Sequence, residues 1–307
     1  VEDTFVIPSV ETLDIWLFSN YNNSNSGNVF YDNLLIEKVE DFKPFITTWK
    51  TDNTGISDSN QIIIPTFQGE DYNYNVNWGD GSTSTNITGD GNHTYQVPGT
   101  YTISISGDFP RIFFDGSRSI SKDFGKLISI DQWGDVSWSS MASAFNGCFN
   151  LNMEAEDVPD LNNVTSLANM FLSCSSLQDN DSWNNWETGT IDKMNGMFFF
   201  SDFNFNISDW DVSNVESMQA MFKLSPFNQN IGDWNVGNVS TMDELFNDTP
   251  FNQDISTWDV SKVVSMVDMF NSSPFNQNIS EWNVSSLANA EFMFANAGLS
   301  FENYDLL

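Results

Sequence analysis

The stretch PFNQNISEWNV, residues Pro274–Val284, reveals the architecture because the chain repeats it. Near-copies precede it at equal steps: PFNQNIGDWNV begins at Pro226 and PFNQDISTWDV begins at Pro250. The first Phe, the first Asn, the Ile and the Trp are kept in all three copies, whereas the two positions before the Trp vary. A short fixed period is typical of repeat proteins, in which one small structural unit is stacked many times.

An aromatic marker sets the length of the repeating unit. It occurs seven times, and the last four steps between markers are equal, whereas the first two are slightly longer. Apolar residues recur at fixed distances before each marker, including a Trp twelve positions before it in six of the seven units. One unit cannot bury its own apolar face, so we expect the units to stack around a continuous core. The markers are Phe145, Phe171, Phe198, Phe222, Phe246, Phe270 and Phe294.

Within a unit, the spacing of apolar residues changes from a strand pattern to a helix pattern. Residues 207–212 predict a short strand, and residues 215–222 have apolar residues at i, i+3, i+6 and i+7, which predicts a two-turn helix. Ser213 and Glu216 match a capping box at the start of that helix. The sequence therefore predicts an α/β solenoid of leucine-rich-repeat type with seven units.

The segment before the repeats has a different pattern. Between residues 41 and 108, stretches of alternating polar and apolar residues are separated by turns rich in Asn, Asp and Gly, which predicts an all-β domain. The motifs WGDGS (Trp78–Ser82), HTY (His93–Tyr95) and PGTYTISI (Pro98–Ile105) stand in this order. They resemble the PKD domain, a small extracellular β-sandwich.

The repeat itself, M-x-x-M-F-x-x-S-P-F-N-Q-N-I-S-x-W-x-V-S-x-V, resembles the BspA-like leucine-rich repeat of bacterial surface proteins, in the form of mycoplasmas and Bacteroidetes. The first two units, AFNGCFNL and MFLSCSSL, resemble its Cys-containing version. The resemblance implies a secreted or surface-displayed protein that binds ligands and is not an enzyme. PKD-like modules precede such repeats in many surface proteins, which agrees with the order of the two regions.

We therefore expect four regions in a fragment of a larger extracellular protein. Residues 1–40 resemble the last two strands of a jelly roll whose start is missing. A PKD-like sandwich at 41–108 and a linker or N-terminal cap at 109–124 follow. Residues 125–307 form the BspA-like solenoid, without its C-terminal cap. The flanking domains of the same polypeptide are expected as partners.

The charge balance excludes several classes of partner. The chain has 42 acidic and 10 basic residues, for a net charge of −32. Such a surface repels nucleic acid and anionic lipid, and no apolar run approaches the roughly 18 residues of a membrane helix. The single histidine, His93, is expected to pack and hydrogen-bond at the base of a hairpin. No catalytic motif is present, so we expect no enzyme activity and no cofactor.

Polar columns between the apolar residues of the predicted strand are the candidate binding surface. They are expected to face outward on the concave side of the solenoid, where repeat proteins bind ligands; the alternative is a solvated face. We expect the Trp column to be core rather than a sugar platform, and the Asn residues of FNQN to stack as structural amides. The candidate residues are Asp209, Asp211, Asp233, Asn235, Asp259, Glu281 and Asn283, with Thr257 in the same columns.

The two cysteines and two acidic loops are each open to two interpretations. Cys148 and Cys174 occupy equivalent positions in consecutive units, and we predict free buried thiols. The alternative, a disulfide, requires their Cα atoms to lie within about 4.4–6.8 Å. Calcium is an alternative to the absence of a cofactor, because the segment DNTGISDSN (52–60) and the WGDG turn offer carboxylate and backbone oxygens.

The sequence thus predicts an adhesin-like binding scaffold at the bacterial surface or in the medium, with an extracellular protein or glycan as its ligand. One alternative is an accessory region of a secreted polysaccharide-degrading enzyme. Another is a structural stalk that binds nothing.

Overall fold

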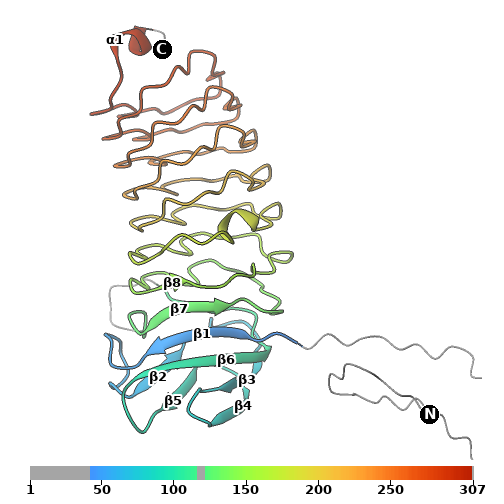
Figure 1. Cartoon of the computed structure of the whole chain (residues 1–307). Coiled ribbons are helices and arrows are strands. Elements are labelled where there is room, and N and C mark those ends of the chain that lie inside the picture. The colour runs from blue at the N-terminus through green and yellow to red at the C-terminus, as the bar shows by residue number, and fades with distance from the viewer. Residues whose placement is uncertain (1–41, 116–121, 306–307) are drawn as a thin grey trace, which may run out of the picture. The chain divides into compact units, whose positions relative to one another are not determined.

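The computed structural model describes residues 42–115 and 122–305, so the jelly-roll strands predicted within residues 1–40 lie outside the described residues. The unit Lys43–Leu307 is compact, and its described residues are rich in β structure and have almost no helix (Figure 1). No helix in the described ranges is long and apolar enough to cross a membrane.

The strands that precede the repeats are present, as the alternating pattern predicts. They form a six-stranded sheet of order β4-β3-β6-β1-β7-β8 and a two-stranded sheet of β2 and β5. Residues of β3 alternate between exposed and buried, so that Tyr74 and Val76 point into the core. The strands are β1 (Phe45–Lys50), β2 (Gln61–Ile64), β3 (Asn73–Asn77), β4 (Thr83–Ile87), β5 (Gly91–Thr94), β6 (Thr100–Asp108), β7 (Leu127–Gln132) and β8 (Asn152–Met153).

The large sheet continues from these strands into the first coil of the repeat region. β7 pairs antiparallel with β1, and β8 pairs parallel with β7. The ring of Phe45 lies 5.8 Å from Trp133 and 5.1 Å from Trp138, measured between centroids. Strands and repeats therefore share one apolar core, and residues of the intervening segment such as Phe109 and Phe114 are buried in it.

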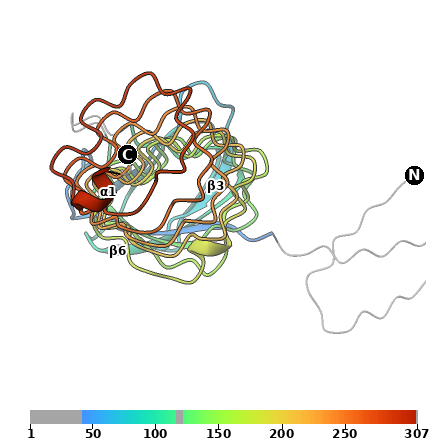
Figure 2. The same cartoon turned by 90° about the horizontal axis from the view of Figure 1, so that it is seen from above.

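The repeat region is a stack of coils, one above another (Figures 1 and 2). Equivalent residues of neighbouring coils form isolated parallel β-bridges along the chain Ser166, Lys193, Ser217, Thr241, Ser265 and Asn289. Around each bridge, every second N–H group bonds to the next coil. Met218, Ala220, Phe222 and Leu224 donate to the carbonyl oxygens of Thr241, Asp243, Leu245 and Asn247 at 3.2, 2.8, 3.2 and 2.9 Å.

The helix predicted at residues 215–222 is wrong, and so is the strand predicted at residues 207–212, where the N–H of Trp210 closes a turn onto the oxygen of Ile207. The intervening N–H groups close tight turns within the coil, as from Met221 to the oxygen of Met218, and an α-helix cannot form when alternate N–H groups bond to another coil. Ala220 and Leu224 have φ values of 53° and 57°, in the left-handed region. Ser213 does not cap a helix either, because no helix follows it; its N–H donates to Oδ1 of Asp211. The helices in the described ranges are η1 (Trp183–Asn185) and α1 (Phe301–Asp305).

The predicted core columns are confirmed. The markers Phe198, Phe222 and Phe246 are fully buried, and neighbouring rings stack at 5.9 Å between centroids. The Trp column is buried beside them, and Trp234 and Trp258 are only 4% and 3% exposed. Each of these two indoles donates a hydrogen bond to a carbonyl oxygen of the preceding coil. The Trp residues are therefore structural and do not form an exposed platform.

Candidate functional site

All residues of the predicted binding columns are exposed, and they lie on successive coils. The structure separates them into two groups by what their side chains bond. Asp211, Asn235, Asp259 and Asn283 form the turn column, and Asp209, Asp233, Thr257 and Glu281 form the outer column.

The turn column serves the fold. Each of its side chains accepts, through Oδ1, the backbone N–H of the second residue after it; the distances are 3.0 Å for both Asp211 and Asp259. Asn235 and Asn283 make the same contact at 3.2 and 3.1 Å. Hydrogen bonds from the following serines hold the pKa of Asp211 and the pKa of Asp259 below their usual range. These side chains close Asx-turns, which is a structural use of the residue.

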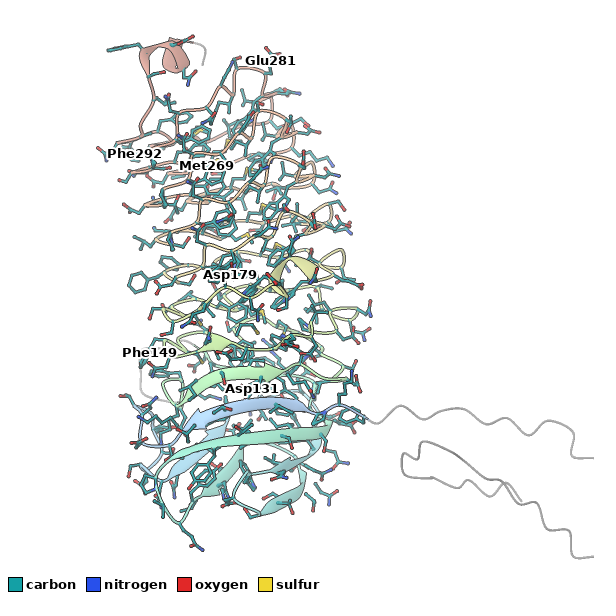
Figure 3. The ribbon with its side chains drawn as sticks, viewed as in Figure 1. Asp131, Phe149, Asp179, Met269, Glu281 and Phe292 are labelled. Carbon is teal, nitrogen blue, oxygen red and sulfur yellow. The ribbon has the colours of Figure 1, made fainter. Side chains whose placement is uncertain are left out.

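The outer column contains the free carboxylates. Asp209 bonds to Asn184 through both its carboxylate and its N–H, and the hydroxyl of Thr257 donates to the oxygen of Gly232 at 2.8 Å. Asp233 and Glu281 make no side-chain hydrogen bond or ion pair with any described residue. Glu281 is marked in Figure 3. These two carboxylates are therefore available to a ligand without any loss of internal bonding.

The amides of the repeated phrase bond to each other along the stack, as predicted. Asn228 Oδ1 accepts the N–H of Asn252 and the side-chain amide of Gln253, both at 3.0 Å. The same pattern links Asn252 to the next coil. At the last coil, Asn303 of α1 takes the place of the glutamine, because its amide donates to Asn276 at 2.9 Å. The FNQN residues are thus part of the scaffold.

A polar cavity of about 620 Å³ lies where the coils are longest, beside β8 and η1, and no prediction from the sequence placed it there. The carboxylates of Glu156, Asp179 and Asp181 make no hydrogen bond or ion pair to described residues; Asp179 is marked in Figure 3. The two longer steps between successive Phe markers are the sequence signal that could have located it. Its lining is Asn152, Met153, Glu154, Ala155, Glu156, Gln178, Asp179, Asn180, Asp181, Ser182 and Asn185.

The buried polar groups of this cavity are satisfied within the protein. The side-chain amide of Asn180 donates to the oxygens of Met153 and Ala155 at 3.0 and 2.9 Å. Ser182, which is 4% exposed, donates its hydroxyl to Asn180 Oδ1 at 2.6 Å. The cavity therefore offers exposed carboxylates to solvent and no unpaired buried group.

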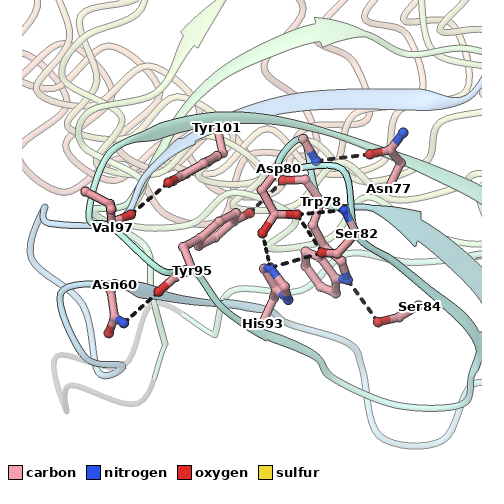
Figure 4. Close-up of polar contacts among 11 residues, drawn as sticks. Asn60, Asn77, Trp78, Asp80, Ser82, Ser84, His93, Tyr95, Val97 and Tyr101 are labelled. Atoms are coloured by element: carbon pink, nitrogen blue, oxygen red, sulfur yellow. Dashed lines mark hydrogen bonds and ion pairs between the residues drawn. The ribbon is translucent and has the colours of Figure 1, made fainter.

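A serine, a histidine and an aspartate meet near the WGDG turn, but not as a catalytic triad (Figure 4). Asp80 and Ser82 both approach Nε2 of His93, at 2.9 and 3.4 Å, whereas a triad places them on opposite ring nitrogens. Ser82 donates to Asp80, and the bonds from Ser82 and His93 lower the pKa of Asp80 to about 2. The ring of His93 stacks on Trp78 at 4.8 Å. Packing and hydrogen bonding of His93 are thus confirmed.

The two cysteines are free, buried thiols. Cys174 donates from Sγ to the carbonyl oxygen of Phe145 at 3.2 Å. Burial raises the pKa of both thiols, which disfavours the reactive thiolate.

The segment that carries the calcium alternative, residues 52–60, turns oxygens of Ser57 and Asp58 toward the ammonium of Lys126. Across the described ranges, no group of three or more His, Cys, Asp or Glu side chains is arranged to hold a metal ion.

Comparisons with known proteins give one match. Searches among curated proteins and among solved structures found nothing similar. A family described as "Mycoplasma protein of unknown function, DUF285" matches residues 139–250 and 224–305, which together span more than half of the chain. The chain belongs to this DUF285 family.

Proposed function

We propose that the chain is a non-catalytic binding scaffold of a secreted or cell-surface bacterial protein, with an extracellular protein or glycan as its ligand. The observation that carries the proposal is the division of the repeated polar positions. Nearly all of them bond within the stack, whereas Asp233 and Glu281 stay exposed and unbonded among the described residues. A repeated scaffold that leaves a few variable side chains free suits recognition along an extended surface.

The proposed architecture is a PKD-like sandwich followed by a BspA-like solenoid of seven units. The Trp78, His93 and Tyr95 cluster supports the first part, because it accounts for the WGDG and HTY motifs that carry the resemblance. The regular parallel bridges and the DUF285 match support the second part. The units of this proposed solenoid are coils of turns and bridges without helices.

The reactive side chains that the sequence offers are occupied within the fold. The His93 cluster is internally bonded, and the thiols are buried. The polar cavity favours the alternative, an accessory glycan-binding region of a polysaccharide-degrading enzyme, because its amides and carboxylates can bond the hydroxyl groups of a sugar. Its lining has none of the aromatic side chains on which sugars commonly stack, which counts against this alternative.

An array experiment tests the proposal. The full chain, fluorescently labelled, is applied to printed extracellular-matrix proteins, host-cell glycans and microbial and plant polysaccharides. Saturable binding to a matrix protein or host-cell glycan supports the scaffold proposal. Binding confined to plant or algal polysaccharides supports the accessory-region alternative and contradicts the scaffold proposal. Binding to nothing contradicts both and leaves the structural stalk.

A further inference from the structure

The junction between the sandwich strands and the first coil contains a buried cage of oxygen atoms around one ammonium group. Nζ of Lys126 lies 2.9 Å from the oxygen of Ser57, 2.7 Å from its hydroxyl, 2.8 Å from the oxygen of Asp58 and 3.0 Å from the oxygen of Gln61. A carboxylate oxygen of Asp123 is 3.9 Å away. Lys126 and Asp123 are both fully buried.

The cage is held in shape by groups other than the lysine. The carboxylate of Asp123 accepts the N–H of Ser57 at 3.0 Å, the hydroxyl of Ser57 at 2.6 Å and the N–H of Ile63 at 2.8 Å. Gly55 allows the loop to approach, because a Cβ there would lie 2.4 Å from Asp123 Oδ1 and 2.7 Å from Cε of Lys126. The loop is thus fixed to the coil side of the junction at several points around the ammonium.

The set of oxygens matches a cation site rather than a conventional lysine ion pair. An ammonium group has three N–H donors, yet four oxygens lie within 3.0 Å and three of them are backbone carbonyls. Hard cations in proteins take carbonyl, hydroxyl and carboxylate oxygens of this kind. The distances exceed the roughly 2.3–2.6 Å of calcium–oxygen contacts and suit a larger monovalent cation.

We propose that the loop of residues 52–61 is a binding site for a monovalent cation such as ammonium or potassium, and that Lys126 supplies this cation from the chain itself. The tethered ammonium attaches the sandwich strands to the first coil, beside the hydrogen bond from Lys50 N–H to the oxygen of Lys126 at 2.8 Å. The junction therefore needs no dissolved cation. This inference does not depend on the proposed binding function.

The test removes the ammonium and offers a free cation in its place. Thermal unfolding of the full chain is measured for wild type, Lys126→Ala and the exposed control Lys50→Ala. Each is measured in equal concentrations of ammonium chloride, potassium chloride and tetramethylammonium chloride, whose cation is too large for the cage. We expect Lys126→Ala to lower Tm by roughly 10 °C in tetramethylammonium, since it leaves a buried carboxylate without its counter-charge.

Ammonium or potassium is expected to restore several degrees of this loss in Lys126→Ala and to leave wild type and Lys50→Ala unchanged. Chelation with EDTA is expected to leave the wild-type Tm unmoved. The proposal is overturned if Lys126→Ala unfolds at the wild-type temperature, or if the three salts give the same Tm. A variant that folds only in ammonium or potassium supports it, and one that folds in none of the salts counts against it.

A second measurement uses the wild-type protein, so its result does not depend on whether Lys126→Ala folds. A buried ammonium held by four oxygens exchanges its protons slowly, so the nitrogen-15 spectrum of lysine-labelled protein should show one protected Nζ ammonium signal at neutral pH. Lys50→Ala should retain this signal. Its absence from wild type would contradict a tethered cation.

Discussion

The indole Nε1 of Trp234 donates a hydrogen bond to the carbonyl oxygen of Ile207 at 3.2 Å, from one coil to the preceding one. Trp210, Trp258 and Trp282 make the equivalent bond, at 2.7, 3.1 and 3.1 Å. The repeated Trp therefore fills the core and gives a main-chain oxygen of the preceding coil a second donor, since the oxygen of Ile207 also accepts the N–H of Trp210 at 3.2 Å. This double role explains why the residue recurs in these coils.

Replacing Trp258 by Phe should destabilise the protein by about 0.5–1.5 kcal/mol through the lost hydrogen bond, because the oxygen of Ile231 then keeps only the N–H of Trp234 as its donor. Trp186→Phe is the matched control. Trp186 is 2% exposed, and its Nε1 has no partner in the described ranges, so removing that nitrogen sacrifices no bond. Urea unfolding of the two variants measures the difference, and equal losses would contradict the role assigned to the indole.

Replacing Asn252 by Ala should cost about 1–3 kcal/mol, since the N–H of Asn276 loses its acceptor and the amide of Gln277 keeps only the backbone oxygen of residue 252. Asn252→Asp keeps an oxygen in the same place and should recover much of the loss. Chemical denaturation of both variants checks this. If Ala and Asp are equally destabilising, the amide column does not work through its Oδ1 atoms.

Replacing Ala220 by Gly should stabilise the protein by about 0.5–1 kcal/mol, because a left-handed φ of 53° is strained for alanine and free for glycine. The neighbouring exposed Gln219 does not have a positive φ. Gln219→Gly should therefore destabilise by about 0.5–1 kcal/mol, the ordinary entropic cost of glycine. Thermal unfolding should therefore show a raised Tm for Ala220→Gly and a lowered Tm for Gln219→Gly. A lowered Tm for both variants would show that the backbone at Ala220 is not strained.

Acid should weaken the sandwich through Asp80. The folded-state pKa of about 2 lies below the ordinary value of 3.8, so the unfolded chain binds the proton more tightly. The stabilisation is complete above about pH 4 and is lost as the pH falls from there toward 2. Asp80→Asn should lower Tm at pH 6, and its difference from wild type should shrink steadily as the pH falls from 4 toward 2, whereas exposed Asp71→Asn should track wild type throughout. A gap for Asp80→Asn that does not change with pH would refute this.

The core of the repeats could be predicted from the sequence, and the backbone of the repeats could not. Val215, Met218 and Phe222 are buried, and tight turns in the backbone direct their side chains into the core. The spacing that these turns require along the sequence is the same as the spacing of one face of a helix, so the pattern predicts a helix that does not form. The hydrogen bonds that define the backbone run to the neighbouring coil, a full repeat away along the chain, so no local pattern reveals them. The left-handed backbone at Leu224 could not be predicted either, because the position holds leucine and not the glycine that usually marks a positive φ.

The candidate site was predicted as a surface but not in its division of roles. Both columns of polar residues are exposed, as expected, yet Asp211 and Asp259 are occupied by turns. An Asp or Asn followed two residues later by Ser or Gly is the Asx-turn pattern that could have identified them. Asp209 is bonded because Asn184 of another coil donates to its carboxylate, whereas Asp233 has no such partner among the described residues. A partner in another coil cannot be found from a local sequence pattern.

Charge reversal shows whether the free carboxylates of the coil stack recognise a ligand, as the proposed function requires. Affinity for the ligand found on the array is measured by surface plasmon resonance for wild type, for Asp233→Lys with Glu281→Lys, and for Asp179→Lys with Asp181→Lys in the cavity. We expect at least a tenfold loss for the first pair and an unchanged affinity for the second. Unchanged affinity for the first pair, or a loss confined to the cavity pair, would contradict recognition by these carboxylates.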